Sequence, residues 1–349
     1  MRTHENILIS SLTTMRIGGP ARYVVEIEKP AEIPEVCRLA ERMGLPIFVL
    51  GEGANTIGHD EGFDGMIMIN RMRGISEENT EGTEIKVMGG ELWDTVVEYA
   101  CSKGLTGIEA LSKIPGLAGA APVQNIGAYG QEVADTLVSI NAFDMVKGTY
   151  VTLKKADLQF AYRKSILNTT EVGRYFVISI NLRMRYGTMA RPFYSSIEKY
   201  IAENGITDLS PQGIRKIVSA IRADKLPDPL VQPSAGSFFK NIYLSRNEAE
   251  AAKDKGYPVY EGRDGYKINS GWFIEQCGLA GKVLHGFRVN EKAALVLINE
   301  SAKTYKELAE ARGEIVNKVY DKFGYWLEQE PVEIMSLGPV NGPVESLVE

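Results

Sequence analysis

The sequence predicts a mixed α+β protein built from three units, and three features of the chain support this prediction. Short apolar strands alternate with amphipathic helices over the N-terminal part of the chain. A Gly/Ala/Pro-rich stretch, residues 114–132, interrupts this alternation but keeps apolar side chains, unlike a flexible linker. The two prolines of KLPDP (225–229) then forbid helix and favour an extended connection to a further α/β region. With 349 residues the chain is long enough for two or three domains.

The first unit is predicted to span residues 1–70. Its helix should begin at Pro30 and end before Gly44, the residue type that most easily adopts the left-handed conformation at a helix C-terminus. Its strands are expected at 23–27, 46–50 and 65–70.

The second unit is predicted to span residues 71–200. In YFVISINLRMR, apolar side chains from Phe176 to Leu182 occupy every second position, which is the pattern of a sheet strand. The other expected elements are strands at 84–89 and 137–143, a strand over 175–185 and a helix over 91–103.

The third unit is predicted to span residues 201–325, followed by a tail, 326–349, that should return to the second unit. Ser270 is the expected N-cap of one of its helices, and Gly324 is expected to end its last helix. The predicted elements are helices at 211–224, 245–255, 270–281 and 303–323 and a buried strand at 294–299.

Composition excludes several functional classes. A net charge of −6 and a pI near 5.4 argue against a general nucleic-acid-binding protein. The N-terminal sequence does not resemble a signal peptide, and no apolar run approaches the length that spans a bilayer. The sparse cysteines and histidines lack the spacing of a disulfide framework or a metal site, so we expect no metal and a cytoplasmic location.

Two stretches have the composition of a ligand-binding loop. LGEGANTIG (50–58) places two glycines after an apolar strand, where free main-chain amides can surround a pyrophosphate; the alternative is a tight turn without a ligand. This stretch lacks the third glycine and the acidic residue of the dinucleotide-binding fingerprint. IPGLAGAAPVQNIGAYGQE (114–132) suits a chain that lies against a flat apolar ring, or a buried loop that packs closely.

Three further stretches combine polar and apolar residues, and each has an ordinary structural interpretation. SAGSFFKN (234–241) has the alternation of a common strand, although it sets Ser237 beside two phenylalanines. FAYRKSI (160–166) could be the solvated face of a helix. In GYWLEQEPVEI (324–334), Glu328 and Glu330 should point to one face of a strand, which is unfavourable unless the strand lies at a solvent-facing edge or a cation or substrate binds there.

Taken together and in this order, these stretches resemble the UDP-N-acetylenolpyruvoylglucosamine reductase (MurB) family over residues 11–335. PVQNIGAYGQE and AGSFFKN carry most of the resemblance, and LGEGAN, AYRKS, KLPDP and LEQEPV add to it. The resemblance implies a bacterial cytoplasmic flavoenzyme of peptidoglycan precursor synthesis. Its implied fold is a two-subdomain FAD-binding module of the vanillyl-alcohol-oxidase (PCMH) type plus a C-terminal α/β substrate-binding domain. Its implied reaction reduces the enolpyruvyl ether of a UDP-sugar with noncovalent FAD and NADPH.

The resemblance also implies roles for individual residues. The catalytic set is Arg163, Ser237 and Glu330, with Ser237 as the proton donor. The FAD-binding set is Gly51, Gly53, Ala54, Asn55, Thr56, Ile114, Pro115, Gly116, Ala120, Asn125, Gly127 and Ala128. The substrate-binding set is Tyr129, Tyr194, Lys225 and Asn241. Tyr194 matches only a tyrosine and the helix after it, so an ordinary surface tyrosine is the alternative there.

Some positions depart from the family pattern. Ala54 stands where serine is common, Lys113 replaces a usual glycine, and HGFRVNEKAA (285–294) lacks the usual small-residue run, which leaves substrate contacts from that segment open. Two other functions remain alternatives: a flavin oxidase on the same scaffold, and a nonenzymatic FAD- or nucleotide-sugar-binding protein. The expected partners are the UDP-sugar and NADPH, without nucleic acid or membrane, and the expected state is a monomer.

Overall fold

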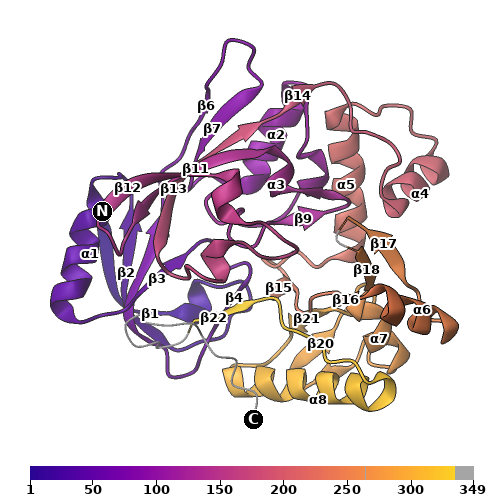
Figure 1. Cartoon of the computed structure of the whole chain (residues 1–349). Coiled ribbons are helices and arrows are strands. Elements are labelled where there is room, and N and C mark those ends of the chain that lie inside the picture. Colours follow the sequence, from indigo (N-terminus) through magenta and orange to yellow (C-terminus); the bar gives the residue numbers. More distant parts are fainter. Residues whose placement is uncertain (264, 335–349) are drawn as a thin grey trace.

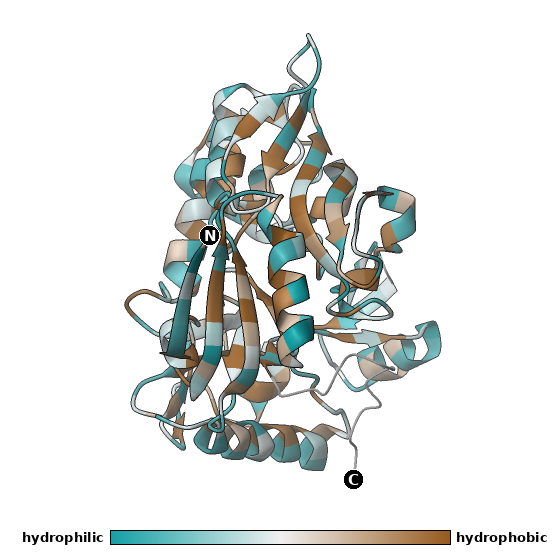
Figure 2. Ribbon diagram, turned by 90° about the vertical axis from the view of Figure 1, so that its left-hand side faces the viewer, coloured by the Kyte–Doolittle hydropathy of each residue, from teal (hydrophilic) through white to brown (hydrophobic). Residues whose placement is uncertain are grey.

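The computed structural model describes residues 1–263 and 265–334. The first unit is a four-stranded sheet in the order β1-β2-β5-β3. Strands β2, β3 and β5 run parallel to one another, and β1 pairs antiparallel with β2. Helix α1 packs its apolar face on this sheet and turns its polar face outward (Figure 2). The elements are β1 (Arg2–Leu8), β2 (Pro20–Ile27), α1 (Glu32–Met43), β3 (Ile47–Leu50) and β5 (Phe63–Asn70).

The second unit is an antiparallel five-stranded sheet in the order β12-β11-β13-β7-β6. One core of this unit lies between the sheet and helix α2, and includes the fully buried Trp93, Ile140 and Ile180. The strands are β6 (Ile75–Glu77), β7 (Glu84–Met88), β11 (Leu137–Asp144), β12 (Thr149–Lys154) and β13 (Tyr175–Arg183). The smaller elements are α2 (Trp93–Ser102), β8 (Leu105–Thr106), β9 (Gly127–Ala128), β10 (Gln131–Glu132), α3 (Val133–Thr136) and β14 (Arg185–Tyr186).

The third unit combines two small antiparallel sheets with three helices around one core (Figure 1). Phe238, Phe239, Phe273 and Phe287 are fully buried in that core. The first sheet contains β15 (Ser234–Ser237), β19 (Val283–Leu284), β20 (Phe287–Val289) and β21 (Val296–Asn299), and the second contains β16 (Ile242–Leu244), β17 (Tyr260–Gly262) and β18 (Gly265–Ile268). The helices are α6 (Arg246–Asp254), α7 (Ser270–Gln276) and α8 (Tyr305–Phe323).

Helices α4 (Ser195–Asn204) and α5 (Pro211–Lys225) lie between the second and third units. α5 was assigned to the third unit from the sequence, but it packs against α2 of the second unit. Arg215 of α5 also forms an ion pair of 2.6 Å with Asp94 of α2. We therefore propose that the boundary between these units lies after α5, near the prolines of KLPDP.

Helix ends test the local predictions. Gly44 and Gly324 adopt the left-handed conformation after α1 and α8, so both predicted C-terminal ends are confirmed. The predicted cap at Ser270 is wrong. Asn269 is the N-cap of α7 and accepts a hydrogen bond from the amide of Gly271, whereas the Ser270 hydroxyl donates to the carbonyl of Lys240. The reason is that Ser270 is fully buried, so its hydroxyl bonds to the main chain between β15 and β16 and is not available to cap the helix.

The C-terminal segment, residues 325–334, leaves α8 and crosses to the first unit (Figure 1). Its strand β22 (Val332–Ile334) pairs in parallel with β4 (Thr56–Gly58). The tail was predicted to return to the second unit, but its strand pairs with the first unit instead. Residues 335–349 of the predicted tail lie outside the described residues. In the described part of the chain, no helix is long and apolar enough to cross a membrane.

Candidate active site

Arg163 lies at the tip of a tight turn. Ala161 and Lys164 close this turn with two main-chain hydrogen bonds of 3.1 Å. Arg163 has a φ of +54°, a left-handed conformation that costs a residue with a side chain about 1 kcal/mol or more. The side chain of Asn168 supports it by donating to the carbonyl of Arg163 at 3.0 Å. The segment is a turn, so the interpretation as a solvated helix face is wrong.

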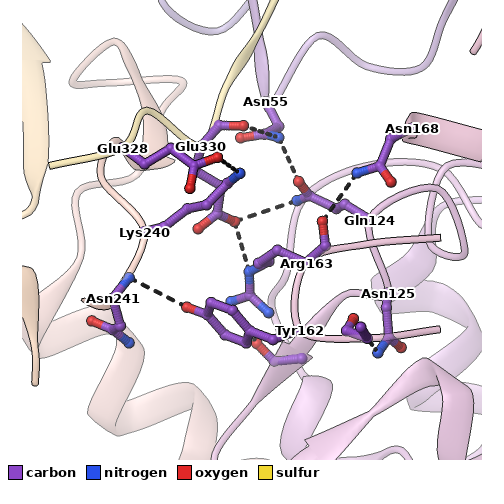
Figure 3. Close-up of polar contacts among 12 residues, drawn as sticks. Asn55, Gln124, Asn125, Tyr162, Arg163, Asn168, Lys240, Asn241, Glu328 and Glu330 are labelled. Carbon is purple, nitrogen blue, oxygen red and sulfur yellow. Dashed lines mark hydrogen bonds and ion pairs between the residues drawn. The ribbon is translucent and has the colours of Figure 1, made fainter. Parts of the chain in front are cut away.

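The turn directs Arg163 at Glu330 of the C-terminal segment (Figure 3). The Arg163 Nε donates to Glu330 Oε1 at 2.8 Å, and Nη2 donates to the carbonyl of Gly127 at 3.1 Å. Only 17% of the Arg163 side chain and 7% of the Glu330 side chain are exposed. Glu328 is 70% exposed and pairs with Lys240 instead. Each carboxylate therefore has its own cation, and only Glu330 is held in the interior.

Two amide side chains extend this pair toward the first glycine-containing loop. Gln124 Nε2 lies 3.5 Å from Glu330 Oε1, and Asn55 Nδ2 donates to Gln124 Oε1 at 2.8 Å. The carbonyl of Asn55 accepts from the amide of Val332 at 3.0 Å. Gln124 was missed as a site residue because its stretch was interpreted through its glycines. Its signal was a polar side chain with no obvious partner in an apolar run.

Burial controls the electrostatics of the pair. Burial raises the pKa of Glu330, because the loss of water around the carboxylate outweighs the charge of Arg163 beside it. Arg163 stays charged, since the carboxylate raises its pKa although burial opposes the charge. The guanidinium also lies 5.0 Å from the ring centre of Tyr162, a favourable cation–π distance. The site therefore holds a fixed cation, Arg163, next to a carboxyl group whose pKa is raised.

Main-chain pairing brings the stretch that follows Ser237 beside the C-terminal segment. Glu330 donates its amide to the carbonyl of Phe238 at 2.9 Å, and Phe239 pairs with Gln329. Phe238 and Phe239 fill the core of the third unit, while Ser237 stays half-buried at the end of β15. The structure thus joins Arg163 to Glu330 and brings the stretch that carries Ser237 next to the C-terminal segment.

The two glycine-containing loops adjoin one another, as a cradle for a flat ligand requires. A cavity of about 70 Å³ lies between them and is lined by Gly51, Gly119, Ala120 and Val123, among others. A methyl group added at Gly51 would stand 3.4 Å from Ala120, and one added at Gly119 would stand 3.0 Å from the carbonyl of Gly89. The small residues therefore keep a narrow space open between the loops, which fits one edge of a flat ligand such as a flavin ring.

The remaining predicted FAD-binding residues lie on the same two loops, in different environments. Gly53 has a φ of +64°, and a side chain there would collide with the carbonyl of Leu12, so the position requires glycine. The side chain of Asn125 is buried and donates to Glu132 at 2.9 Å and to the carbonyl of Ala161 at 3.2 Å. It therefore holds the loop in shape. The other members are Ala54, Asn55, Thr56, Ile114, Pro115, Gly116, Gly127 and Ala128.

Of the predicted substrate residues, the two tyrosines contact each other, and Asn241 contacts the Arg163 turn. The rings of Tyr129 and Tyr194 pack edge to face, 5.8 Å between centres. Asn241 lies near the Arg163 turn, because its main-chain amide donates to the hydroxyl of Tyr162 at 3.4 Å. Lys225 has an exposed side chain at the end of α5, about one turn from Arg222. The role of Lys225 in substrate binding stays a prediction.

The fold and the site define a flavin-dependent oxidoreductase. A family model described as an FAD binding domain matches residues 21–154, which cover both glycine-containing loops. A second model, the C-terminal domain of UDP-N-acetylenolpyruvoylglucosamine reductase, matches residues 228–334, from β15 to β22. The chain therefore carries FAD as its cofactor, and the predicted fold class is confirmed.

Similar proteins identify the particular enzyme. The chain is 35% identical over 343 residues to UDP-N-acetylenolpyruvoylglucosamine reductase of Dechloromonas aromatica, covering 95% of this chain and 99% of that protein. It is 34% identical over 329 residues to the reductase of Ralstonia nicotianae, covering 92% and 96%. The MurB crystal structure from Thermus caldophilus shares the fold, with a TM-score of 0.68, 24% identity and coverage of 95% and 99%. The chain belongs to the UDP-N-acetylenolpyruvoylglucosamine reductase (MurB) family. It has UDP-N-acetylmuramate dehydrogenase activity in peptidoglycan precursor synthesis.

Proposed function

We propose that the chain reduces UDP-N-acetylglucosamine enolpyruvate to UDP-N-acetylmuramate with NADPH as the reductant, and that Ser237 gives the proton to carbon. When bound, FAD supplies the hydride that adds to the methylene carbon of the enol ether. The electron pair of the double bond then moves to the neighbouring carbon and into its carboxylate. The main task of the protein is to stabilise that negative charge.

Arg163 is the group proposed to stabilise the developing anion. Its guanidinium is held by Glu330 through Nε and by the carbonyl of Gly127 through Nη2, which leaves further N–H donors for a substrate carboxylate. Glu330 fixes the orientation of the arginine, and Gln124 contacts the same oxygen of Glu330. Burial raises the pKa of Glu330, so its carboxylate takes up a proton more readily than an exposed glutamate does.

Ser237 is proposed to complete the reaction. Its O–H bond breaks as a C–H bond forms at the carbon that bears the ether oxygen, and the serine regains its proton from water. A serine hydroxyl is a weak acid, but a carbanion is a strong base, so proximity decides the rate. The single observation that supports this assignment is the hydrogen bond from the Glu330 amide to the carbonyl of Phe238, the residue that follows Ser237 in the chain.

The remaining roles follow from the family. Tyr129, Tyr194, Lys225 and Asn241 are proposed to bind the UDP part of the substrate. The Tyr129–Tyr194 contact supports a common surface for these two residues, and the contact of Asn241 with Tyr162 supports its position near Arg163. We further propose a cytoplasmic monomer, in keeping with a UDP-sugar substrate and NADPH.

A Ser237→Ala variant tests the proton-donor assignment. Flavin bleaching by NADPH without oxygen should proceed at the wild-type rate, because this step needs no proton on carbon. Re-oxidation by UDP-N-acetylglucosamine enolpyruvate should slow by about 100-fold or more. Ser102→Ala, at the exposed end of α2, is the control. Equal loss in both half-reactions, or no loss, would remove Ser237 from this role, and re-oxidation faster by oxygen than by the enolpyruvyl substrate would favour an oxidase.

A further inference from the structure

A closed cluster of polar side chains lies on the opposite side of the C-terminal segment from Glu330. We call it the Glu333 cluster, and its members are His59, Tyr305, Arg312, Gln329 and Glu333. Glu333 Oε2 accepts from the Tyr305 hydroxyl at 3.0 Å and lies 2.8 Å from His59 Nε2. Its other oxygen accepts from Arg312 at 2.8 Å and from Gln329 at 3.1 Å. Both oxygens of this carboxylate are therefore fully used by the protein.

The cluster joins three parts of the chain. His59 follows β4 of the first unit, and its ring stacks on Tyr305 at 3.7 Å between centres. Tyr305 and Arg312 lie on α8 of the third unit. The neighbouring Asp60 also accepts from the amide of Tyr305 at 2.7 Å, which holds the start of α8 against the first unit. The C-terminal segment is thus fastened at the junction of the two units.

Alternation along the extended segment separates the cluster from the site. Gln329 and Glu333 project toward α8, where Arg312 Nη1 donates to both, at 2.7 and 2.8 Å. Glu330, adjacent to Gln329, projects to the other side and meets Arg163 at 2.8 Å. Because one cation grips two residues of the segment, the segment cannot shift or rotate without breaking these bonds.

Electrostatics favours the same arrangement. Burial opposes ionisation of Glu333, but hydrogen bonds from His59, Gln329 and Tyr305 and the charge of Arg312 outweigh it and lower the pKa of Glu333. Glu333 is therefore a charged carboxylate with hydrogen bonds to both oxygens, while the Glu330 carboxylate has fewer hydrogen-bond donors. Within the described residues, the hydrogen bonds of the Glu333 and Arg312 side chains all stay inside the cluster.

We propose that Arg312 and Glu333 are positioning residues that fix the Glu330 carboxyl group beside Arg163, in the geometry needed to stabilise the substrate anion. This inference rests on the proposed function of Glu330. A shift of about 1 Å in a catalytic group can cost about 100-fold in rate, so a loosened segment should slow the step that uses Glu330. Flavin reduction by NADPH, which does not use this group, should be unaffected.

The experiment compares the two half-reactions in the flavin-loaded enzyme carrying Arg312→Met or Glu333→Gln. We expect re-oxidation by UDP-N-acetylglucosamine enolpyruvate to slow by about 10- to 100-fold, with flavin reduction by NADPH within twofold of wild type. Arg312→Lys should recover part of the loss. Arg174→Met is the matched control, because Arg174 is a similarly buried arginine that pairs with Asp144 and lies outside the Glu333 cluster. It should change neither half-reaction.

A double variant distinguishes positioning from general stability. Adding Arg312→Met to Glu330→Gln should slow re-oxidation no further than Glu330→Gln alone, because both act through one carboxyl group. If Arg312→Met does not fold, Tyr305→Phe removes one bond to Glu333 and should slow re-oxidation selectively. Equal loss in both half-reactions, or additive losses in the double variant, overturns the inference. If Glu330→Gln alone has no effect, the proposed role of Glu330 fails as well; if Glu330→Gln is slow and Arg312→Met is normal, only the positioning role fails.

Discussion

Two arginine–carboxylate pairs in this molecule differ in how completely the carboxylate is satisfied. Asp94 on α2 accepts from Arg215 at 2.6 and 3.0 Å, from the amide of Lys113 at 2.7 Å, and forms an ion pair with the Lys113 ammonium at 2.9 Å. Glu330 has one strong donor, Arg163 at 2.8 Å, and a long contact with Gln124 at 3.5 Å. The first carboxylate is saturated, whereas the second keeps capacity for another partner.

Their pKa values move in opposite directions as a result. Burial opposes the charge on Asp94, but the donors from Arg215 and Lys113 outweigh it and hold its pKa well below the usual range. Burial of Glu330 outweighs its single cation, and its pKa is raised. A saturated pair fixes the packing of α5 on α2, while an incompletely satisfied pair is suited to bind a ligand.

The largest effect is expected at the incompletely satisfied pair. Arg163→Met removes the cation that stabilises the substrate anion, so re-oxidation by the enolpyruvyl substrate should slow by about 100- to 1000-fold. Stopped-flow absorbance of the flavin measures this directly. Flavin reduction by NADPH is the internal control. A loss below tenfold would mean that Arg163 does not face the developing charge.

At the saturated pair, stability should change more than activity. Asp94→Asn removes an anion with several charge-assisted hydrogen bonds, so the free energy of unfolding near pH 7 should fall by about 2 kcal/mol. Urea denaturation measures the loss. The two half-reactions should stay within about threefold of wild type at a temperature where the variant is folded. A larger fall in re-oxidation than in stability would contradict the comparison.

The pH dependence of that loss sharpens the comparison. The pKa of Asp94 is lower in the folded than in the unfolded chain, so its stabilisation is complete above the unfolded value of about 3.9 and disappears as pH falls through the folded value. The stability gap between wild type and Asp94→Asn should therefore be constant near neutral pH and shrink on acidification below about pH 4. A gap that widens toward acid would assign the effect to another group.

The smallest effect is expected at a third pair, which is exposed. Glu328 pairs with Lys240, but its side chain is 70% exposed, and water screens the interaction. Glu328→Ala should change the free energy of unfolding by less than about 0.5 kcal/mol and leave re-oxidation near the wild-type rate. Glu330→Gln, two positions along the segment, should by contrast slow re-oxidation. A large kinetic loss in Glu328→Ala would give this carboxylate a role at the site.

Local features of the sequence predicted most of the fold. Alternating apolar residues located β13, and glycines located the ends of α1 and α8, because these signals depend on a few neighbouring residues. Pairing of β22 with β4 was not predictable in this way, since it joins residues 276 positions apart, Thr56 and Val332. The same limit applies to α5, whose contact with the second unit depends on Arg215 and Asp94, residues 121 positions apart.

The site was predictable where residue type and family pattern coincided. Arg163, Ser237 and Glu330 were expected on three separate stretches, and the structure brings those stretches together. Gln124 and the Glu333 cluster were missed, because their significance depends on which carboxylate each side chain meets. Nothing in the short stretch around His59 indicates a contact with Glu333.

The C-terminal segment has a consequence for the order in which the enzyme becomes competent. Ribosomes produce the chain from its N-terminus, and domains fold as they emerge. Both glycine-containing loops and the arginine turn are complete long before residue 330 is synthesised. The nascent protein thus holds its cofactor-binding residues early, but β4 gains its partner strand β22, and the site its last acidic group, only when nearly all of the polypeptide has been translated.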